Sequence, residues 1–450
     1  MQLSRFTSIT KWKNSILLIN GLSGAIDIVD GNTANIIFKN RKQELLTTSK
    51  QRKLVRLFEK RGHLTSRTSN EEYAEAVSFS KKYSKKLSLI KKVHIIVPSY
   101  KCNLRCTYCL QSRLRKKQQK WLQKTMDETT VNRVFDAIKQ IDGPYPNPLP
   151  IHIYGGEPLL PENADIVKYI LKLGKSLGRR FYFVTNGVYL RDFIRLLRRF
   201  DIDGVQITLD GIRRVHDVRR IGIDGKGSFD QIIESIEAAR KAGFRLSIRI
   251  CTDSSNIKEL PELARFIESM GWDTDKNITP YIAPVRGEGI CYQFYPWNVS
   301  PNELAAVASN DATLSRMVRY VFHSIQKKTI SENRQWIPQV YYCEAIFSQI
   351  YYDAHGDLYA CTGSLGNKLL RTGRFMPKLE FNALYREWTN RHVFSLQKCQ
   401  KCRNALVCGG GCSYNAFLNT RSISTSECMS FSVIQKQYLR SMFGTLSRPD

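Results

Sequence analysis

The sequence Cys102-Asn-Leu-Arg-Cys106-Thr-Tyr-Cys109 places three cysteines in the spacing C-x3-C-x2-C. Three thiolates on one short loop can hold three irons of a cubic 4Fe–4S cluster and leave the fourth iron without a protein ligand. An open iron can bind and reduce a small molecule, which a fully ligated electron-transfer cluster cannot do. At this cysteine content, about one random sequence in a hundred would contain the spacing by chance. The residues around the loop must therefore decide its meaning.

A regular alternation of strands and helices begins at Lys92. Apolar and β-branched runs predict the strands, and amphipathic periodicity predicts the helices between them. Six strand–helix units predict a parallel sheet that curls into a partial (β/α)6 barrel over residues 93–285. The predicted strands are 93–97, 151–154, 181–184, 205–209, 246–251 and 278–283, and the predicted helices are 127–141, 164–177, 189–199, 228–242 and 257–270.

Four unusual loops follow the carboxyl ends of predicted strands: the cysteine loop, Gly155-Gly-Glu-Pro158, Thr185-Asn-Gly187 and Asp210-Gly211. In barrels of βα units this face carries the chemistry. Each loop taken alone is more often only a turn. Their shared position on one face favours a functional site over four unrelated turns.

These loops and their neighbours supply side chains that suit a bound amino acid and a nucleoside. Glu157, on a two-glycine turn, can accept hydrogen bonds from an ammonium group. Arg220 can donate two parallel hydrogen bonds to a carboxylate. Polar groups for a ribose, and a flat face beside the cysteines, come from Asn186, Thr208, Asp210 and Tyr108.

A second group of seven cysteines gives a more specific signal. Four of them follow the spacing C-x2-C-x5-C-x3-C, which random chains would show far less often than the first spacing. Structural zinc is the main alternative, because C-x2-C pairs bind zinc tetrahedrally. One four-ligand zinc site would leave three cysteines over, so residues 341–430 predict a domain held together by metal clusters. The seven are Cys343, Cys361, Cys399, Cys402, Cys408, Cys412 and Cys428.

The flanking segments lack such motifs. Residues 1–92 predict a small α+β module with two strands within Ser15–Asp30, a third strand at Thr33–Phe38, and helices at 48–60 and 71–89. Residues 286–340 predict a helical bridge, with helices at 301–308 and 312–327, and residues 431–450 predict a C-terminal helix and tail.

The composition is that of an ordinary globular chain with excess positive charge. Hydrophobic residues make up 42% of the 450 residues, and no apolar run approaches the roughly 20 residues of a membrane span. The net charge of +29 suits an acidic partner or simply a solvated surface, and no nucleic-acid motif accompanies it. Twelve cysteines without an export signal favour metal binding in the cytoplasm.

The motifs resemble the radical S-adenosylmethionine superfamily. The resemblance rests on the cysteine loop, the Gly155–Pro158 turn, Thr185–Gly187 and Leu209-Asp-Gly211. It implies that Cys102, Cys106 and Cys109 ligate the cluster while S-adenosylmethionine chelates the fourth iron. Electron transfer to the sulfonium would then release a 5′-deoxyadenosyl radical that abstracts a substrate hydrogen. The implied contacts are Gly155, Gly156 and Glu157 for the methionine amine, Thr185, Asn186, Thr208 and Asp210 for the nucleoside, and Arg220 for the carboxylate.

Further motifs resemble the subgroup with a C-terminal SPASM domain. They are His216-Asp-Val-Arg-Arg220, Gly225-Lys-Gly-Ser-Phe-Asp230 and the second cysteine group. The resemblance implies two auxiliary 4Fe–4S clusters, and so three clusters in all. Cys399, Cys402, Cys408 and Cys428 would hold the outer one, and Cys343, Cys361 and Cys412 the inner one.

The inner set is one ligand short. Some relatives carry a further cysteine a few residues before the first, where this chain has Ile337. The inner iron is therefore either open or closed by Cys291 from the bridge. Cys251 lies in a predicted strand and is interpreted as a buried core thiol.

The resemblance extends to enzymes that modify ribosomally made peptides. It implies a precursor peptide as substrate, a leader held by the N-terminal module, and a reductant such as flavodoxin or ferredoxin. The expected product is a side-chain crosslink (carbon–carbon, ether or thioether), as in darobactin-type maturases. The alternative within enzymes is a sulfatase maturase that forms formylglycine, although such relatives usually have Asp where this chain has Thr362. A cluster protein without radical chemistry is the alternative from another class, and no residue stands out as a general base.

Overall fold

The computed structural model describes residues 1–12, 14–39, 48–111, 120–285, 299, 301–308, 311–318 and 336–428. The chain divides into two compact units, each built from segments far apart in the sequence. We call them the barrel unit and the cysteine-rich unit. Of the described residues, those within 91–318 and 345–386 belong to the barrel unit, and those within 1–90, 336–344 and 387–428 belong to the cysteine-rich unit.

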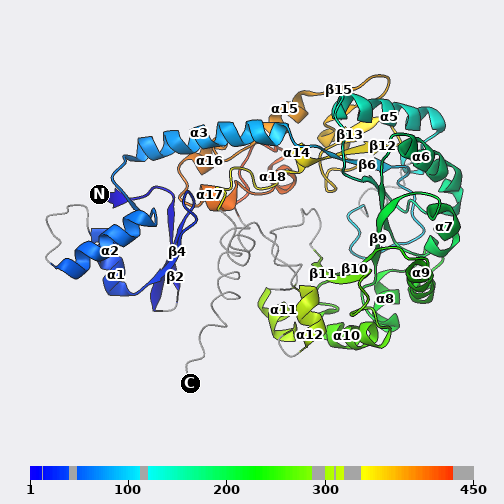
Figure 1. The fold of residues 1–450 in the computed structure, drawn as a ribbon, viewed down its shortest axis with the longest axis horizontal. Helices are drawn as coiled ribbons and strands as arrows, with labels where there is room; N and C mark the ends of the chain where they lie inside the picture. Colours follow the sequence, from blue (N-terminus) through cyan, green and yellow to red (C-terminus); the bar gives the residue numbers. More distant parts are fainter. Residues whose placement is uncertain are drawn as a thin grey trace. The chain divides into compact units, whose positions relative to one another are not determined.

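The barrel unit is organised around one sheet, in the order β11-β10-β9-β8-β7-β6-β12-β13-β14-β15. Its first six strands are all parallel and neighbour one another in chain order; β6, β9, β10 and β11 among them are labelled in Figure 1. This arrangement confirms the predicted partial (β/α)6 barrel. The six strands are β6 (Val93–Val97), β7 (Ile151–Ile153), β8 (Phe181–Thr185), β9 (Ile202–Thr208), β10 (Leu246–Thr252) and β11 (Ile278–Pro284).

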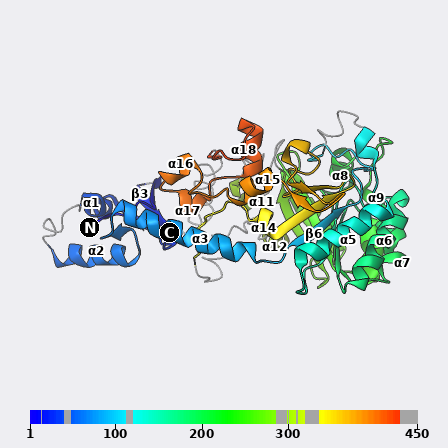
Figure 2. The same ribbon diagram turned by 90° about the horizontal axis from the view of Figure 1, so that it is seen from above.

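Helices cover the outer face of these strands, and their predicted positions are confirmed within a few residues (Figure 2). Helix α5 begins where predicted, because the Asp127 carboxylate accepts a hydrogen bond from Thr130 N at 2.7 Å. The helices are α5 (Glu128–Asp142), α6 (Ala164–Ser176), α7 (Leu190–Leu197), α9 (Phe229–Lys241) and α10 (Leu260–Ser269), followed by α11 (Pro301–Ala308) and α12 (Ala312–Val318).

The main core lies between the strands and these helices. Phe181 and Phe183 of β8, like Val205 and Ile207 of β9, have no exposed surface. Such two-residue spacing is the pattern of a strand with one face fully covered. One short helix, α8 (Arg213–Arg219), was not predicted from the sequence.

Four further strands extend the barrel sheet beyond β6. Strand β12 (Gln349–Asp353) pairs with β6 in parallel, and β13 (Asp357–Tyr359), β14 (Gly373–Arg374) and β15 (Glu380–Phe381) continue antiparallel. Residues 345–386 therefore group with the barrel unit, although their sequence lies within the predicted cysteine-rich segment. Short helices α14 (Ala345–Ser348) and α15 (Ala383–Thr389) flank these strands in the chain.

The cysteine-rich unit begins with an antiparallel sheet of β2 (Thr7–Trp12), β3 (Ser15–Asn20) and β4 (Ile26–Val29). The two strands predicted within Ser15–Asp30 are confirmed, whereas β2 and the small β1–β5 pair were missed. The predicted helices at 48–60 and 71–89 are confirmed as α2 and α3. The remaining elements of this unit are β1 (Gln2–Leu3), α1 (Gly31–Lys39), α2 (Ser49–Lys60), β5 (Leu64–Thr65), α3 (Ser69–Ser88), α16 (Gln397–Gln400), α17 (Ala405–Cys408) and α18 (Ser413–Thr420).

The strand predicted at Thr33–Phe38 is wrong, because these residues belong to helix α1. The Asp30 carboxylate accepts a hydrogen bond from Thr33 N at 2.7 Å and so caps the first turn. Ala34 and Ile37, three residues apart, are both buried. The cap and this spacing outweigh the β-branched run that suggested a strand.

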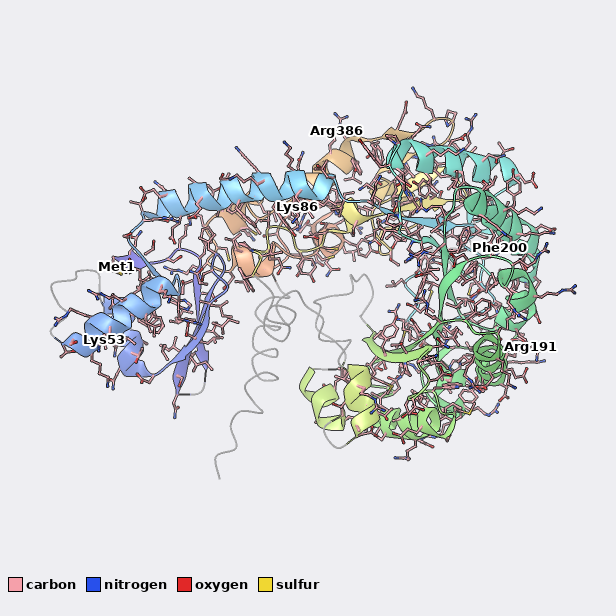
Figure 3. All side chains as sticks on the ribbon, viewed as in Figure 1. Met1, Lys53, Lys86, Arg191, Phe200 and Arg386 are labelled. Carbon is pink, nitrogen blue, oxygen red and sulfur yellow. The ribbon has the colours of Figure 1, made fainter. Side chains whose placement is uncertain are left out.

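Several expectations concern the remaining surface and segments. Lys53, Lys86, Arg191 and Arg386 are exposed and project from the ribbon in Figure 3, as a solvated basic surface would. No helix among the described ranges is long and apolar enough to cross a membrane. Three predictions from the sequence concern residues outside the described ranges: the role of Cys291, the end of the predicted helix at 319–327, and the C-terminal helix and tail at 431–450.

Candidate functional site

The cysteine loop follows β6 and is anchored to the segment after α8. Arg105 N donates a hydrogen bond to Ile221 O at 2.7 Å, and Ile223 N donates to Asn103 O at 2.9 Å. The three cysteines are partly exposed, and the other two thiols act electrostatically on that of Cys106. The three thiols of the loop are therefore close enough to act on one another electrostatically.

The two-glycine turn after β7 lies directly against the chain that leads into the cysteine loop. Gly156 N donates to Ser99 O at 3.1 Å, and Glu157 N donates to Lys101 O at 2.7 Å. A side chain on Gly156 would overlap the carbonyl oxygens of Tyr100 and Lys101. Glycine is thus required for this close approach of two backbones.

The Glu157 carboxylate joins this turn to the next one. It is 1% exposed and accepts hydrogen bonds from Thr185 Oγ1 at 2.6 Å and from Asn186 N at 2.6 Å. Leu159 N donates a third at 2.9 Å. Burial raises the pKa of Glu157, and these hydrogen bonds and the Arg220 charge counteract that rise. The carboxylate therefore fixes the relative position of two loops.

Asn186 brings the turn after β8 to the cysteine loop. Its Nδ2 donates to Asn103 Oδ1 at 2.7 Å and lies 3.8 Å from Cys102 Sγ. Its Oδ1 accepts from Val188 N at 2.9 Å, which closes the turn. A polar contact on a thiol is the kind of interaction that tunes a metal ligand.

Tyr108 and Asp210 form a second hydrogen-bond network beside the cysteine loop. The Tyr108 hydroxyl donates to the Asp210 carboxylate and accepts from Arg220 Nη1 at 2.8 Å. Asp210, which is fully buried, also accepts from Cys251 N at 3.0 Å. Burial raises the pKa of Tyr108 well above its usual value, and the Arg219 guanidinium lies 5.0 Å over its ring. One face of the ring is therefore already covered.

One pocket collects most of the predicted residues at the carboxyl ends of the strands. Glu157 and Asp210 are the two described candidates that do not line it, because their carboxylates face the loops behind its wall. The predicted residues that do line it are Cys102, Cys106, Tyr108, Cys109, Gly155, Gly156, Thr185, Asn186, Thr208 and Arg220.

The pocket also contains residues that the sequence reasoning missed. Gln206 lines it with Thr208 of β9, and Arg249 lines it with Cys251 of β10. Residues two apart in a strand share a face, so polar side chains at this spacing in apolar strands were the available signal. Cys251 is buried at 6% exposure as expected, but it belongs to the pocket wall.

The pocket residues fit an iron–sulfur cluster and an anionic group beside it. Arg220 is 5% exposed, and its Nε has no hydrogen-bond partner among the residues that the structure describes. A buried unsatisfied donor is costly, and a ligand carboxylate would supply the acceptor. Burial raises the pKa of Cys106 to about 12, so a thiolate at this position needs a nearby positive charge such as iron.

The four cysteines predicted as the outer set lie together in the cysteine-rich unit. Burial raises the pKa of Cys408 to about 12, and Cys399, Cys402 and Cys428 all act on it in the same direction. Burial likewise raises the pKa of Cys399 to about 11. Across the described ranges, no three His, Cys, Asp or Glu side chains converge as ligands of a single metal ion would.

The three cysteines of the predicted inner set are not all assigned to the same compact unit. Cys343 and Cys412 belong to the cysteine-rich unit, and Cys361 follows β13 of the barrel unit. Ile337, at the position where some relatives have a further cysteine, is 42% exposed. The fourth ligand of the predicted inner cluster, which is either Cys291 or absent, stays a prediction.

Comparison with known proteins adds a family. Residues 96–267 match the Radical SAM superfamily. The chain is 26% identical over 325 residues to "Mycofactocin maturase MftC" of Mycolicibacterium smegmatis, which covers 70% of this chain and 76% of that protein. It is 22% identical over 341 residues to a "Cysteine-type anaerobic sulfatase-maturating enzyme" of Clostridium novyi, covering 70% of this chain and 86% of that protein.

Among solved structures, the chain resembles Streptococcus suis SuiB bound to precursor peptide SuiA. The TM-score is 0.54 at 17% identity, and the match covers 96% of this chain and 99% of SuiB. At this identity the likeness shows a common fold. It extends over the N-terminal module, the barrel and the cysteine-rich segment alike.

Proposed function

We propose that this protein, whose residues 96–267 match the Radical SAM superfamily, is a radical SAM maturase of a ribosomally made peptide. The observation that carries the proposal is the pocket, which joins three thiols, the Gly155–Gly156 turn and the buried Arg220 at the carboxyl ends of parallel strands. The fold match to a peptide-bound relative over almost the whole chain supports a peptide substrate.

Cys102, Cys106 and Cys109 would hold the first 4Fe–4S cluster, and the pocket beside them would hold S-adenosylmethionine. When bound there, that pair supplies a 5′-deoxyadenosyl radical that removes a hydrogen atom from the substrate. Arg220 would bind the ligand carboxylate through its Nε, which has no partner among the described residues. Asn186 and Thr208, which line the pocket, would contact the nucleoside.

The remaining pocket residues would orient the substrate and keep water out. Glu157 and Asp210 hold the loops from behind, as their hydrogen bonds indicate. Gln206 and Arg249 offer polar contacts further along the wall. A site that is held in place by buried hydrogen bonds needs little reorganisation during the reaction.

Two auxiliary 4Fe–4S clusters would bring the total to three. The outer set is the better supported, because its four thiols act on one another in a single unit. These clusters would accept the electron left over after hydrogen abstraction, so that the peptide loses two hydrogens in total. A flavodoxin or ferredoxin would supply the electron that starts the reaction.

The modification we favour is a side-chain crosslink within the peptide, with the leader held by the N-terminal module. That module presents a three-stranded sheet with an edge strand, β2, and edge pairing is a common way to hold an extended peptide. The 90 residues in front of the barrel unit are more than hydrogen abstraction itself requires.

Formylglycine formation is the second candidate, supported by the Clostridium novyi relative. Thr362 counts against it, because its hydroxyl is engaged with the Tyr351 hydroxyl at 2.7 Å and is no acid. From serine, formylglycine formation removes two hydrogens as a crosslink does, so the total mass does not separate the two reactions. From cysteine, the substrate of the Clostridium novyi relative, it also replaces sulfur by oxygen, so the total mass does separate them.

The test is anaerobic incubation of the reduced protein with the short peptide encoded beside its gene. A crosslink predicts loss of two hydrogens and no fragmentation between the joined residues in tandem mass spectrometry. Formylglycine predicts full fragmentation and reaction with an aldehyde reagent. The protein with Cys102→Ala is the matched control. Absence of 5′-deoxyadenosine from the parent protein would refute the enzymatic proposal.

A further inference from the structure

Arg391 is buried inside the cysteine-rich unit at 5% exposure and donates hydrogen bonds to four backbone carbonyl oxygens. Its Nη1 donates to Gly411 O at 2.8 Å, and its Nη2 donates to Thr425 O at 2.7 Å and Gly410 O at 3.2 Å. Its Nε donates to Ile423 O. One guanidinium thus contacts two separate stretches of chain.

Both stretches carry cysteines. The first joins Cys408 to Cys412, and the second leads to Cys428. Because Arg391 binds carbonyls in both, it helps to fix the distance between these two loops. A backbone hydrogen bond from Glu427 N to the first loop, at Gly410 O and 3.1 Å, reinforces the same junction.

The first loop is built for this contact. Its three glycines, Gly409, Gly410 and Gly411, have φ values of 73°, 85° and 79°, a left-handed run that other residues rarely adopt. A side chain on Gly411 would overlap Glu427 O, and one on Gly409 would lie 2.5 Å from Tyr342 N. Only glycines therefore let the loop pack here and offer its carbonyls to the guanidinium.

Among the residues that the structure describes, the four hydrogen-bond acceptors of the Arg391 guanidinium are all neutral carbonyls, and none is a carboxylate. Burial lowers the pKa of Arg391, and the thiols of Cys412, Cys399 and Cys408, together with Glu427, oppose that change. A buried cation is costly unless anions lie near it. Cysteine thiolates on a metal cluster would provide that negative charge.

We propose that Arg391 is a positioning residue for the outer auxiliary cluster and that its buried charge raises the reduction potential of that cluster. The inference rests on the proposed function for the assignment of the cluster to Cys399, Cys402, Cys408 and Cys428. Reduction adds one negative charge to an iron–sulfur cluster, so a fixed cation nearby favours the reduced form. The four hydrogen bonds hold that cation and the ligand loops in one arrangement.

The test compares Arg391→Met and Arg391→Lys with the parent protein after anaerobic reconstitution. Iron and sulfide are counted per chain, and the auxiliary clusters are titrated with reductant and followed by electron paramagnetic resonance. The Arg391→Met variant should contain less iron per chain than the parent, and the outer auxiliary clusters that still form in it should have a lower reduction potential. Arg391→Lys keeps the charge without the four-point contact, so it should lose iron with a smaller fall in potential. Arg403→Met, at an exposed residue next to Cys402, should change neither quantity.

Iron content and potential equal to the parent in Arg391→Met would overturn the inference. Cys402→Ala and Cys428→Ala separate this outcome from failure of the cluster assignment. If neither variant loses iron, these cysteines hold no cluster and the assignment fails. If both lose iron while Arg391→Met does not, only the role of Arg391 falls. Should Arg391→Met not fold, as judged by lost 5′-deoxyadenosine formation without peptide, the potential of Arg391→Lys decides.

Discussion

Glu157 and Asp210 act from behind the pocket wall. Each buried carboxylate accepts hydrogen bonds from two separate segments of the chain, so each holds these segments together without lining the pocket itself. The sequence motif that contains Glu157 had suggested direct contact with an amine. In the structure its oxygens are already engaged, and the neighbouring glycines are the residues that line the pocket.

This assignment predicts the effect of Glu157→Gln. One oxygen becomes an NH2 group that faces the hydroxyl of Thr185 or the backbone N–H of Asn186, so a buried donor is left unsatisfied. The free energy of unfolding should fall by about 1–3 kcal/mol, measured by urea denaturation under anaerobic conditions. Thr185→Ala removes only one hydrogen-bond partner of Glu157, so it should lower the free energy of unfolding by less. A large loss of S-adenosylmethionine affinity at unchanged stability would instead indicate direct binding.

Arg220 gives the complementary prediction, because it does line the pocket. Arg220→Met should weaken S-adenosylmethionine binding roughly 10- to 100-fold, as expected for the loss of a charged hydrogen bond. Equilibrium binding to the reconstituted protein measures this, with the iron count showing that the first cluster persists. Arg213→Met is the control, because Arg213 begins helix α8, which ends just before Arg220, and is exposed and paired with Asp230. Equal affinity in Arg220→Met would exclude a carboxylate contact.

At the scale of elements, the barrel was predictable and the pocket only in part. Strands and helices of the barrel follow simple periods, since each buries one face. Helix α1 was mistaken for a strand, because a single capping contact from Asp30 outweighed local β propensity. Gln206 and Arg249 were missed, because the register between β9 and β10 depends on contacts that no local pattern contains.

His152 of strand β7 should make the stability of the protein depend on pH. Burial lowers the pKa of His152 to about 4, and its ring lies 4.9 Å from that of Tyr182 on β8. In the unfolded chain the His152 imidazole binds a proton near pH 6.5, whereas in the folded chain it binds one only near pH 4. The free energy of unfolding is therefore highest above about pH 6.5 and falls as the pH drops toward 4. His152→Gln should flatten this part of a stability-against-pH curve. An unchanged slope would show that the ring takes up its proton in the folded protein.

At the scale of the whole chain, the cysteine-rich unit combines three segments that lie far apart in the sequence. Helix α3 contacts the chain around Cys343 through two hydrogen bonds. The Tyr83 hydroxyl donates to Glu344 Oε1 at 2.5 Å, and the Ser84 and Tyr341 hydroxyls lie 2.7 Å apart. More than 250 residues separate the partners along the chain, so no local pattern could have predicted them.

These contacts predict that the N-terminal module supports auxiliary cluster binding. Tyr83→Phe combined with Ser84→Ala removes both hydrogen bonds and should release the segment that carries Cys343, at about 1 kcal/mol for each bond. The expected result is faster loss of auxiliary iron to a chelator, while the first cluster still forms 5′-deoxyadenosine. Lys86→Ala, at an exposed position on the same helix, should release iron at the parent rate. If the double variant also matches the parent rate, helix α3 has no part in holding this segment, and the module would then serve the peptide alone.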